Sequence, residues 1–506
     1  MALFSALTLL VLAPLSALVL RIIYNVYFHP LSKFPGPWYA ASFSLTDAVI
    51  CLLRWEHEWL LDLTKKYAHT NMPVRIAPNV LLFPKPSTIK DIYWDAKHNT
   101  KSTLYGTGVL GPPHLFSTLD GNEHRALRKA LGGPQWSFGA LKNTWEPRID
   151  SLILLFTSKL SHLAQQDQPI IICDKAAQFA ADIMTMLSFS TPWGFVENQR
   201  DERHLLESWR DGLNFFGFAA RFRWFRETVL KSPLLKPYLL PSAKDTRGMG
   251  YLIGQADVQI TERERRIEEE GYTQDKPDYI QYALQARVNG KPLDPIQKRA
   301  HATLLIQAGA DTTGTGLGNT LRFLTMNRAC YDKARTEIAA AEEKGFLSTP
   351  IKYEETITHL PYFVACIKES LRVGPPGPQQ LTRMCAKGGA WIGGYFIPGG
   401  TEMTSYSYVV HRDPGMYAPD PDAFRPERWL ESEKKAAEME AANFGFGVGP
   451  RVCLGKDIAY FEMYKLLPEI IRRFDLELVD EGRYLVAGGV AFNQGLAMKL
   501  MVREVN

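Results

Sequence analysis

The sequence predicts a mainly α-helical protein with small β-sheets. Apolar residues recur at helical spacing through most of the chain after about residue 45, as in 149–163 and 176–189. One helix is expected to run from residue 295 to about 327, roughly 48 Å at 1.5 Å per residue, because Asp294 and Gln297 fit a capping box. Strand-like stretches are short and lie at 74–76, 80–83, 390–392 and 496–502.

Composition excludes several classes of protein. The chain has 506 residues, of which 46% are hydrophobic, so it can bury a large core and is not disordered. A net charge of +4 over this length gives no strong field for nucleic acid. The six cysteines form no C-x-x-C pair, which excludes zinc ribbons, ferredoxin-type clusters and covalently attached c-type haem.

Residues 1–21 are expected to form a transmembrane signal-anchor. Residues 3–20 are uncharged and mostly apolar, and as a helix they would span about 27 Å, close to the hydrocarbon thickness of the endoplasmic reticulum membrane. A cleaved signal peptide is the alternative, but no Lys or Arg precedes the run, and the run exceeds the usual length of a signal's apolar region. Arg21 and Lys33 follow the span, which favours a single-pass topology with a cytosolic body.

Residues 22–40 are expected to form a Pro-rich hinge between this anchor and the body at 41–506. The stretch 29–37 (HPLSKFPGP) holds three prolines and a glycine, which prevent a helix from continuing. An ordinary linker is the alternative, but the position between an anchor and a long body favours an orienting role.

The most informative segment is 444–455 (FGFGVGPRVCLG), called the cysteine loop below. Its glycines and Pro450 force a tight, non-helical backbone. Helical character follows at 457–473, so Cys453 lies near a helix N-terminus, where backbone N–H groups stabilise a thiolate. Such a cysteine suits either a covalent nucleophile or a single axial metal ligand, and the loop by itself leaves both uses open.

Phe446, Gly449, Arg451, Cys453 and Gly455 reproduce the signature F-x-x-G-x-R-x-C-x-G, and through it the chain resembles the cytochrome P450 family of haem-thiolate monooxygenases. The resemblance implies the P450 fold after the transmembrane helix, with 41–506 as the haem-thiolate catalytic domain. It also implies haem b as the cofactor, with Cys453 as the axial ligand of the iron. All five signature residues are expected to bind the cofactor, Arg451 through a propionate.

On the long predicted helix, AGADTT at 308–313 resembles the family's oxygen-activation motif. Thr312 can bond to the carbonyl one turn back and loosen the helix there. Gly309 removes a side chain where something bulky is expected to pass. The resemblance implies two catalytic residues: Thr312 stabilises the reduced oxygen species, and Asp311 helps to supply protons through water.

Glu369 and Arg372 match the family's E-x-x-R motif, and with Arg428 the resemblance implies a structural triad for folding and haem retention. The same spacing occurs at Glu197/Arg200, Glu207/Arg210 and Glu262/Arg265, where ordinary surface ion pairs are expected. Three further residues resemble the family's propionate ligands, with surface cations as the alternative: His124, Arg128 and Arg383.

The resemblance also implies partners. No flavin- or NADPH-binding region is recognised, so electrons are expected from NADPH through a separate NADPH–cytochrome P450 reductase, with cytochrome b5 as a further donor. Four cations after the cysteine loop are candidates for docking an acidic reductase face, although cations near a helix C-terminus are favoured anyway: Lys456, Lys465, Arg472 and Arg473. The expected location is the endoplasmic reticulum membrane, with the catalytic domain in the cytosol and no nucleic-acid partner.

The hinge and the HRDP…PERWL segment are most similar to fungal microsomal members of the family. The expected function is activation of O2 to hydroxylate or otherwise oxidise a hydrophobic small molecule, an intermediate of a fungal secondary metabolite such as a polyketide, terpenoid or alkaloid. The pocket is expected to be lined by the long helix and by 102–117, 205–225, 374–382 and 488–492. The alternatives are a haem-thiolate isomerase or dehydratase that needs no O2, and a non-catalytic membrane-tethered binding protein.

Overall fold

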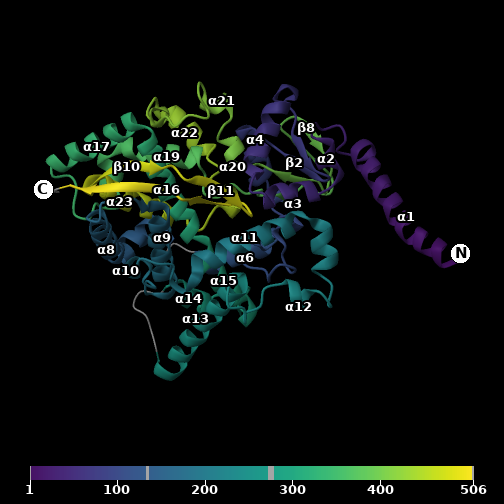
Figure 1. Ribbon diagram of the computed structural model, residues 1–506, viewed down its shortest axis with the longest axis horizontal. Helices are drawn as coiled ribbons and strands as arrows, with labels where there is room; N and C mark the ends of the chain where they lie inside the picture. Colours follow the sequence, from purple (N-terminus) through teal and green to yellow (C-terminus); the bar gives the residue numbers. More distant parts are fainter. Residues whose placement is uncertain (1, 133–135, 272–277, 504–506) are drawn as a thin grey trace.

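The computed structural model describes residues 2–132, 136–271 and 278–503, with side chains from residue 12 onward except at 307. Helices form most of the body, and short strands form small sheets at its edges (Figure 1). The predicted fold class, mainly α with small β-sheets, is confirmed for this part of the chain.

The helices range from single turns to more than six turns. The main ones are α1 (Ala2–Ile23), α2 (Trp38–Ser42), α3 (Leu45–Leu52), α4 (Glu56–Tyr67), α5 (Ile89–Tyr93), α6 (Gly121–Leu131), α8 (Glu146–Ala164), α9 (Ile172–Phe189), α11 (Leu205–Arg221), α12 (Lys236–Leu239), α13 (Gly248–Glu270), α14 (Tyr279–Gln285), α15 (Pro295–Ala308), α16 (Ala310–Met326), α17 (Arg328–Glu343), α18 (Tyr353–His359), α19 (Pro361–Val373), α22 (Glu433–Ala441) and α23 (Lys456–Arg473).

The largest sheet has the strand order β1-β2-β9-β6, in which β2 and β9 run parallel and the other pairs antiparallel. A second sheet has the order β10-β13-β3, and three hairpins complete the β structure. The strands are β1 (Val74–Ala77), β2 (Val80–Leu82), β3 (Ile170–Ile171), β4 (Arg287–Val288), β5 (Lys291–Pro292), β6 (Arg383–Met384), β7 (Ala390–Ile392), β8 (Tyr395–Ile397), β9 (Glu402–Thr404), β10 (Phe474–Asp480), β11 (Arg483–Ala487), β12 (Val490–Gln494) and β13 (Ala497–Val502). All four predicted strands are present.

The long predicted helix is present but is not continuous. The capping box forms as expected, with the N–H of Gln297 donating to Asp294 Oδ1 at 2.7 Å and the N–H of Asp294 donating to Gln297 Oε1 at 3.3 Å. A single residue outside the helical pattern, Gly309, then separates α15 from α16. The expectation of one uninterrupted helix is therefore wrong at that residue.

Close packing explains the small residues of α16. This helix lies in the middle of the body, with α9 against one side (Figure 1). A Cβ on Gly314 would lie only 2.6 Å from the Cα of Ala177 on α9, and a Cβ on Gly309 would collide with Met184. The two backbones can therefore approach each other only with glycine here. The bulky group that approaches Gly309 is a side chain of the protein itself.

The N-terminal region contains α1, which leads away from the body (Figure 1). Among the residues that the structure describes, no helix combines the length and the apolar character needed to cross a bilayer. The transmembrane anchor therefore stays a prediction. The stretch 29–37 is not a free linker, because Leu31 and Phe34 are buried and the N–H of Arg75 donates to the carbonyl of Pro35 at 2.7 Å.

Glu369 on α19 joins this helix to the segment 411–429. Its carboxylate accepts from the guanidinium of Arg372 at 2.8 and 2.9 Å and from Arg428 Nε at 2.9 Å. Trp429 Nε1 donates to the same carboxylate at 3.0 Å. Burial alone would raise the pKa of Glu369, but the two arginines outweigh burial and lower it. The stabilisation is therefore present at neutral pH and lost only as the pH falls below the usual range of a glutamate.

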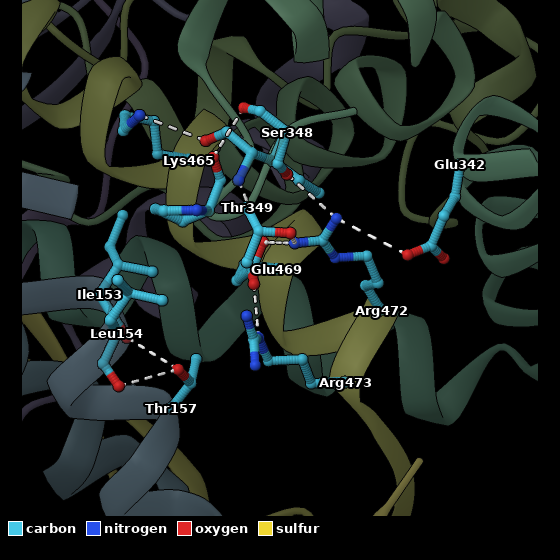
Figure 2. A network of polar contacts seen from close by, with 12 residues as sticks. Ile153, Leu154, Thr157, Glu342, Ser348, Thr349, Lys465, Glu469, Arg472 and Arg473 are labelled. Carbon is cyan, nitrogen blue, oxygen red and sulfur yellow. Dashed lines mark hydrogen bonds and ion pairs between the residues drawn. The ribbon is translucent and has the colours of Figure 1, made fainter. Parts of the chain in front are cut away.

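Two of the cations proposed for reductase docking are buried. Figure 2 shows Lys465, Arg472 and Arg473 of α23 around Glu469, within the protein. Lys465 Nζ lies 2.6 Å from Glu146 Oε1, and Arg472 Nη2 lies 2.6 Å from Glu469 Oε2. The docking expectation is wrong for Lys465 and Arg472, because this end of α23 packs in the core rather than facing solvent.

Replacing Glu369 with glutamine should lower the free energy of unfolding by about 3–5 kcal/mol, because it leaves two buried guanidinium groups without a countercharge. Glu262→Gln is the matched control, since Glu262 pairs with Arg265 in the same E-x-x-R spacing but on an exposed face of α13. Urea denaturation followed by tryptophan fluorescence should show a lower midpoint for the first variant only. Equal midpoints for the two variants would contradict the structural role of Glu369.

Candidate functional site

The cysteine loop is held in shape by its own backbone. The N–H of Cys453 donates to the carbonyl of Phe446 at 2.9 Å, and the N–H of Val452 donates to Gly449 at 3.1 Å. Gly449 has a φ of +70°, and a Cβ there would lie 2.6 Å from the carbonyl oxygen of Tyr93. A side chain at this position would be both strained and blocked. The loop therefore presents Cys453 directly before α23.

Cys453 combines an exposed residue surface with a thiol that protein atoms surround. Its residue surface is exposed, unlike that of the buried cysteines, yet protein surrounds the thiol and burial raises its pKa. The backbone N–H groups of Gly455 and Lys456 and the charge of Arg128 oppose this rise in pKa. A metal cation at the sulfur would add to these influences and favour the thiolate.

Two other signature residues border the thiol. A Cβ on Gly455 would lie 4.0 Å from Cys453 Sγ, so glycine leaves the sulfur uncovered on that side. The ring of Phe446 packs against Tyr460, with ring centroids 5.2 Å apart. Both residues therefore lie close to Cys453: Gly455 through this spacing, and Phe446 through its carbonyl, which accepts the N–H of Cys453.

Five basic side chains converge beside the cysteine loop. They come from separate parts of the fold. Lys101 precedes α6, His124 and Arg128 lie on α6, Arg383 lies in β6, and Arg451 lies in the cysteine loop. Burial, followed by the charges of the other four, lowers the pKa of His124 to about 3, so this imidazole is neutral near pH 7. The structure brings together all the predicted propionate ligands.

These cations have oxygen acceptors but no carboxylate partners in the described part of the chain. Arg128 Nη1 donates to the carbonyl of Val452 at 2.6 Å, and Arg383 Nη1 donates to the carbonyls at 381 and 382. Arg451 donates to Asn99 Oδ1 at 2.9 Å and to the carbonyls of Thr118 and Leu119. Arg451 therefore also ties the cysteine loop to the chain before α6.

Lys101 was missed by the sequence analysis. Its ammonium group is buried, donates to the carbonyl of Phe116, and lies 3.8 Å from the ring centroid of Tyr105. Burial, followed by the charges of Arg383 and Arg451, lowers the pKa of Lys101 well below its usual range. No spacing in the sequence marks this lysine, because it joins the cluster only by pairing with Arg383 across an isolated β-bridge.

Thr312 lies in the first turn of α16, directly after the break at Gly309. Its hydroxyl donates to the carbonyl of Ala308 at 2.8 Å, as the sequence predicted. This bond reaches across the break, and Ala308 itself keeps exposed surface in the middle of the α15–α16 pair. The local loosening expected at this threonine is thus present.

Asp311 is buried and held by an arginine that the sequence analysis assigned to a surface ion pair. Arg210 Nη2 lies 2.6 Å from Asp311 Oδ1, and Arg210 Nε lies 3.1 Å from both carboxylate oxygens. The expected pair of Glu207 with Arg210 is wrong, since Glu207 contacts His204 instead. Burial would lower the pKa of Arg210, but Asp311 raises it overall.

The segments predicted to line the pocket meet at α16. Thr315 Oγ1 donates to the carbonyl of Ala491 at 2.9 Å, and the N–H of Ala491 donates to Pro376 at 2.8 Å. Ser102 and Thr382 share a hydrogen bond of 2.7 Å between their hydroxyls. These hydrogen bonds join three of the segments to one another and to α16.

The residues present fit haem. The group carries two carboxylates, and the cluster offers cations that have no acidic partner. It also needs one axial ligand, and the thiol of Cys453 lies beside that cluster, near Arg128.

Known proteins match this chain over nearly its whole length. The family model described as Cytochrome P450 matches residues 76–486. The chain is 32% identical over 504 residues to the cytochrome P450 monooxygenase gsfF of Penicillium aethiopicum, covering 96% of each chain. It is 31% identical over 462 residues to the cytochrome P450 monooxygenase cicH of Emericella nidulans, covering 89% of each chain. It is 30% identical over 458 residues to a cytochrome P450 monooxygenase of Aspergillus terreus, covering 88% of this chain and 90% of the relative. The predicted similarity to fungal members is confirmed.

Lys101→Met should weaken haem retention, because a hydrogen bond to a charged partner contributes about 1.5–3 kcal/mol. The rate of haem transfer to excess apomyoglobin should rise roughly tenfold or more. Lys97→Met, at an exposed lysine four residues earlier, is the control and should leave the rate unchanged. Identical transfer rates for both variants would remove Lys101 from the site.

Proposed function

Because the chain belongs to the cytochrome P450 family, and with it to the P450 monooxygenases, we propose that it activates O2 to hydroxylate or otherwise oxidise a hydrophobic small molecule. The observation that carries the proposal is the thiol of Cys453 beside a cluster of cations without acidic partners. A binding protein without catalysis would have no need of both features together with the buried Asp311 and its neighbour Thr312.

Cys453 would hold haem through its thiolate, and the basic cluster would hold the two carboxylates. Bound haem supplies the one-electron and oxygen chemistry of the reaction. The protein contributes binding, orientation and proton control. Thr312 offers a hydroxyl in the first turn of α16, whose present acceptor is the carbonyl of Ala308. Rotation of this hydroxyl away from Ala308 would let it donate into the pocket.

Asp311 is proposed to help supply protons through water, and Arg210 is its positioning residue. Both carboxylate oxygens of Asp311 accept hydrogen bonds from Arg210, which fixes the orientation of the carboxylate. Arg210 also lies 3.9 Å from Asp174, whose side chain is half exposed. This arrangement links the buried carboxylate to the surface of the protein, from which protons must come.

We assign a hydrophobic substrate on the basis of the surface that the converging segments leave uncovered. Phe116 keeps 40% of its surface exposed, and Ala308, one turn before Thr312, is also exposed. The polar groups nearby are occupied by one another, as at Ser102 and Thr382. The proposed substrate is an intermediate of a fungal secondary metabolite, such as a polyketide, terpenoid or alkaloid, and the similarity to fungal cytochrome P450 monooxygenases supports the fungal part of this proposal.

Electrons are proposed to come from NADPH through a separate reductase, with cytochrome b5 as a further donor.

The proposed location is the endoplasmic reticulum membrane, with residues 1–21 as anchor, 22–40 as hinge and 41–506 in the cytosol. Large apolar side chains that remain exposed near α2, α3 and α12 support contact with lipid: Trp38, Trp55, Trp224, Leu234 and Tyr238.

Cys453→Ser should abolish the strongly red-shifted Soret band that the reduced, carbon monoxide-treated wild type is expected to show. Cys330→Ser, at a half-buried cysteine on α17, is the control and should keep the band. Difference spectra of membranes containing each protein provide the measurement. A folded, haem-containing wild type without this band would mean that Cys453 is not the ligand.

Thr312→Ala should keep the haem spectrum but lower the ratio of product to NADPH consumed roughly tenfold or more, because the hydroxyl that positions a proton is gone. Thr325→Ala is the control, since Thr325 makes the same bond to the carbonyl four residues earlier on α16. NADPH oxidation, peroxide and product are measured with reductase present. Unchanged coupling would overturn the role of Thr312, and turnover without reductase or NADPH would favour the isomerase alternative.

A further inference from the structure

A group of buried charges lies where α3, α4 and α11 meet. Asp47, Glu56 and Arg221 come from these three helices, and each has at most 6% of its surface exposed. Arg221 Nε lies 2.5 Å from Glu56 Oε1 and 3.8 Å from Asp47 Oδ1. Two carboxyl groups therefore face a single guanidinium.

Gln380 shows how close the two carboxyl groups are. Its Nε2 donates to Asp47 Oδ1 at 3.0 Å and to Glu56 Oε1 at 2.8 Å, so both oxygens lie against the same nitrogen. Tyr406 donates its hydroxyl proton to the other oxygen of Glu56 at 3.3 Å. These donors are neutral, so they add hydrogen bonds but no positive charge.

The other titratable groups around Asp47 do not supply a second cation. Burial raises the pKa of Cys51 on α3 to about 12 and that of Tyr406 well above its usual range, so both are neutral. Glu402 on β9 is a further acid, and its own partner is Arg223 at 3.7 Å. Among the described residues, Arg221 is thus the positive group that contacts Asp47 and Glu56.

A fully ionised cluster would carry one buried negative charge without a partner. Such a charge costs several kcal/mol, and a carboxyl group in that position takes up a proton instead. We propose that Asp47 and Glu56 share one proton, and that this proton keeps α11 seated against α3 and α4. The seating of α11 is then sensitive to pH.

The direction of this dependence follows from Asp47. Burial raises the pKa of Asp47 to about 7, against the lowering by Arg221 and with a further rise from Glu56. A carboxyl group whose pKa is raised in the seated state stabilises that state at low pH, and the stabilisation is lost as the pH rises toward 7. The unseated fraction should therefore grow by up to about tenfold per pH unit below pH 7 and level off above it.

The same helix reaches the active site. α11 carries Arg221 at its C-terminal end and Arg210, the partner of Asp311, in its middle. Movement of α11 away from α3 would also loosen the ion pair that holds Asp311. The shared proton thus couples bulk pH to the positioning of Asp311.

Hydrogen exchange of the full-length, haem-containing protein tests the proposal. After correction for the intrinsic pH dependence of exchange, peptides covering 205–221 should lose protection by about fivefold between pH 6 and pH 7, with little further change above pH 7.5. Peptides from α23 serve as the internal reference. Wild-type α11 with protection independent of pH would overturn the proposal.

Two amide substitutions isolate the proton. Asp47→Asn imitates the protonated group and should keep α11 protected at every pH, and Glu56→Gln should also remove the pH dependence, because one carboxylate then has Arg221 to itself. Asp62→Asn, at an exposed acid on α4, is the control and should behave as wild type. If Asp47→Asn retains the wild-type pH dependence, another group is responsible and the shared proton is excluded. Asp47→Asn alone decides the matter if Glu56→Gln does not fold.

Discussion

The position of Cys453 depends on the buried carboxylate of Glu369. This group fixes Arg372, whose Nη1 donates to the carbonyl of His411 at 2.7 Å. The ring of His411 in turn accepts the N–H of Phe444 at 2.8 Å, at the start of the cysteine loop. Burial lowers the pKa of His411 to about 3, so the ring stays a neutral acceptor across the physiological range. The carboxylate of Glu369 therefore determines where the cysteine loop holds the thiol, although Glu369 lies far from Cys453 in the sequence.

The second constraint is the close approach of α9 and α16. Glycine at 314 permits that approach, and glycine at 309 makes room for Met184. The helix breaks at Gly309, two residues before Asp311 and three before Thr312. The two polar residues of the proposed reaction therefore lie in the first turn of a helix, where backbone N–H groups are not all used within the helix.

The sequence predicted mainly those parts of the site that a short run of neighbouring residues marks. The cysteine loop and the capping box at Asp294 are read from neighbouring residues, whereas the triad at Glu369 follows from the family resemblance, since Arg428 lies 59 positions away. Arg210 and Lys101 could not be found in that way, because each acquires its role from a residue more than a hundred positions away. The docking expectation for Lys465 failed for a related reason: position within a helix does not reveal which face the core covers.

The basic cluster, which has no carboxylate partner, affects how the protein matures after synthesis. Lys101, Arg383 and Arg451 repel one another, and Asp120 offsets only part of this repulsion at Arg451. A newly synthesised chain would therefore close this region last and would leave it accessible until a dianionic ligand arrives. Cofactor insertion then becomes the final folding step rather than an addition to a finished protein. Cellular supply of haem would set how much of the chain reaches its mature form and how much is degraded.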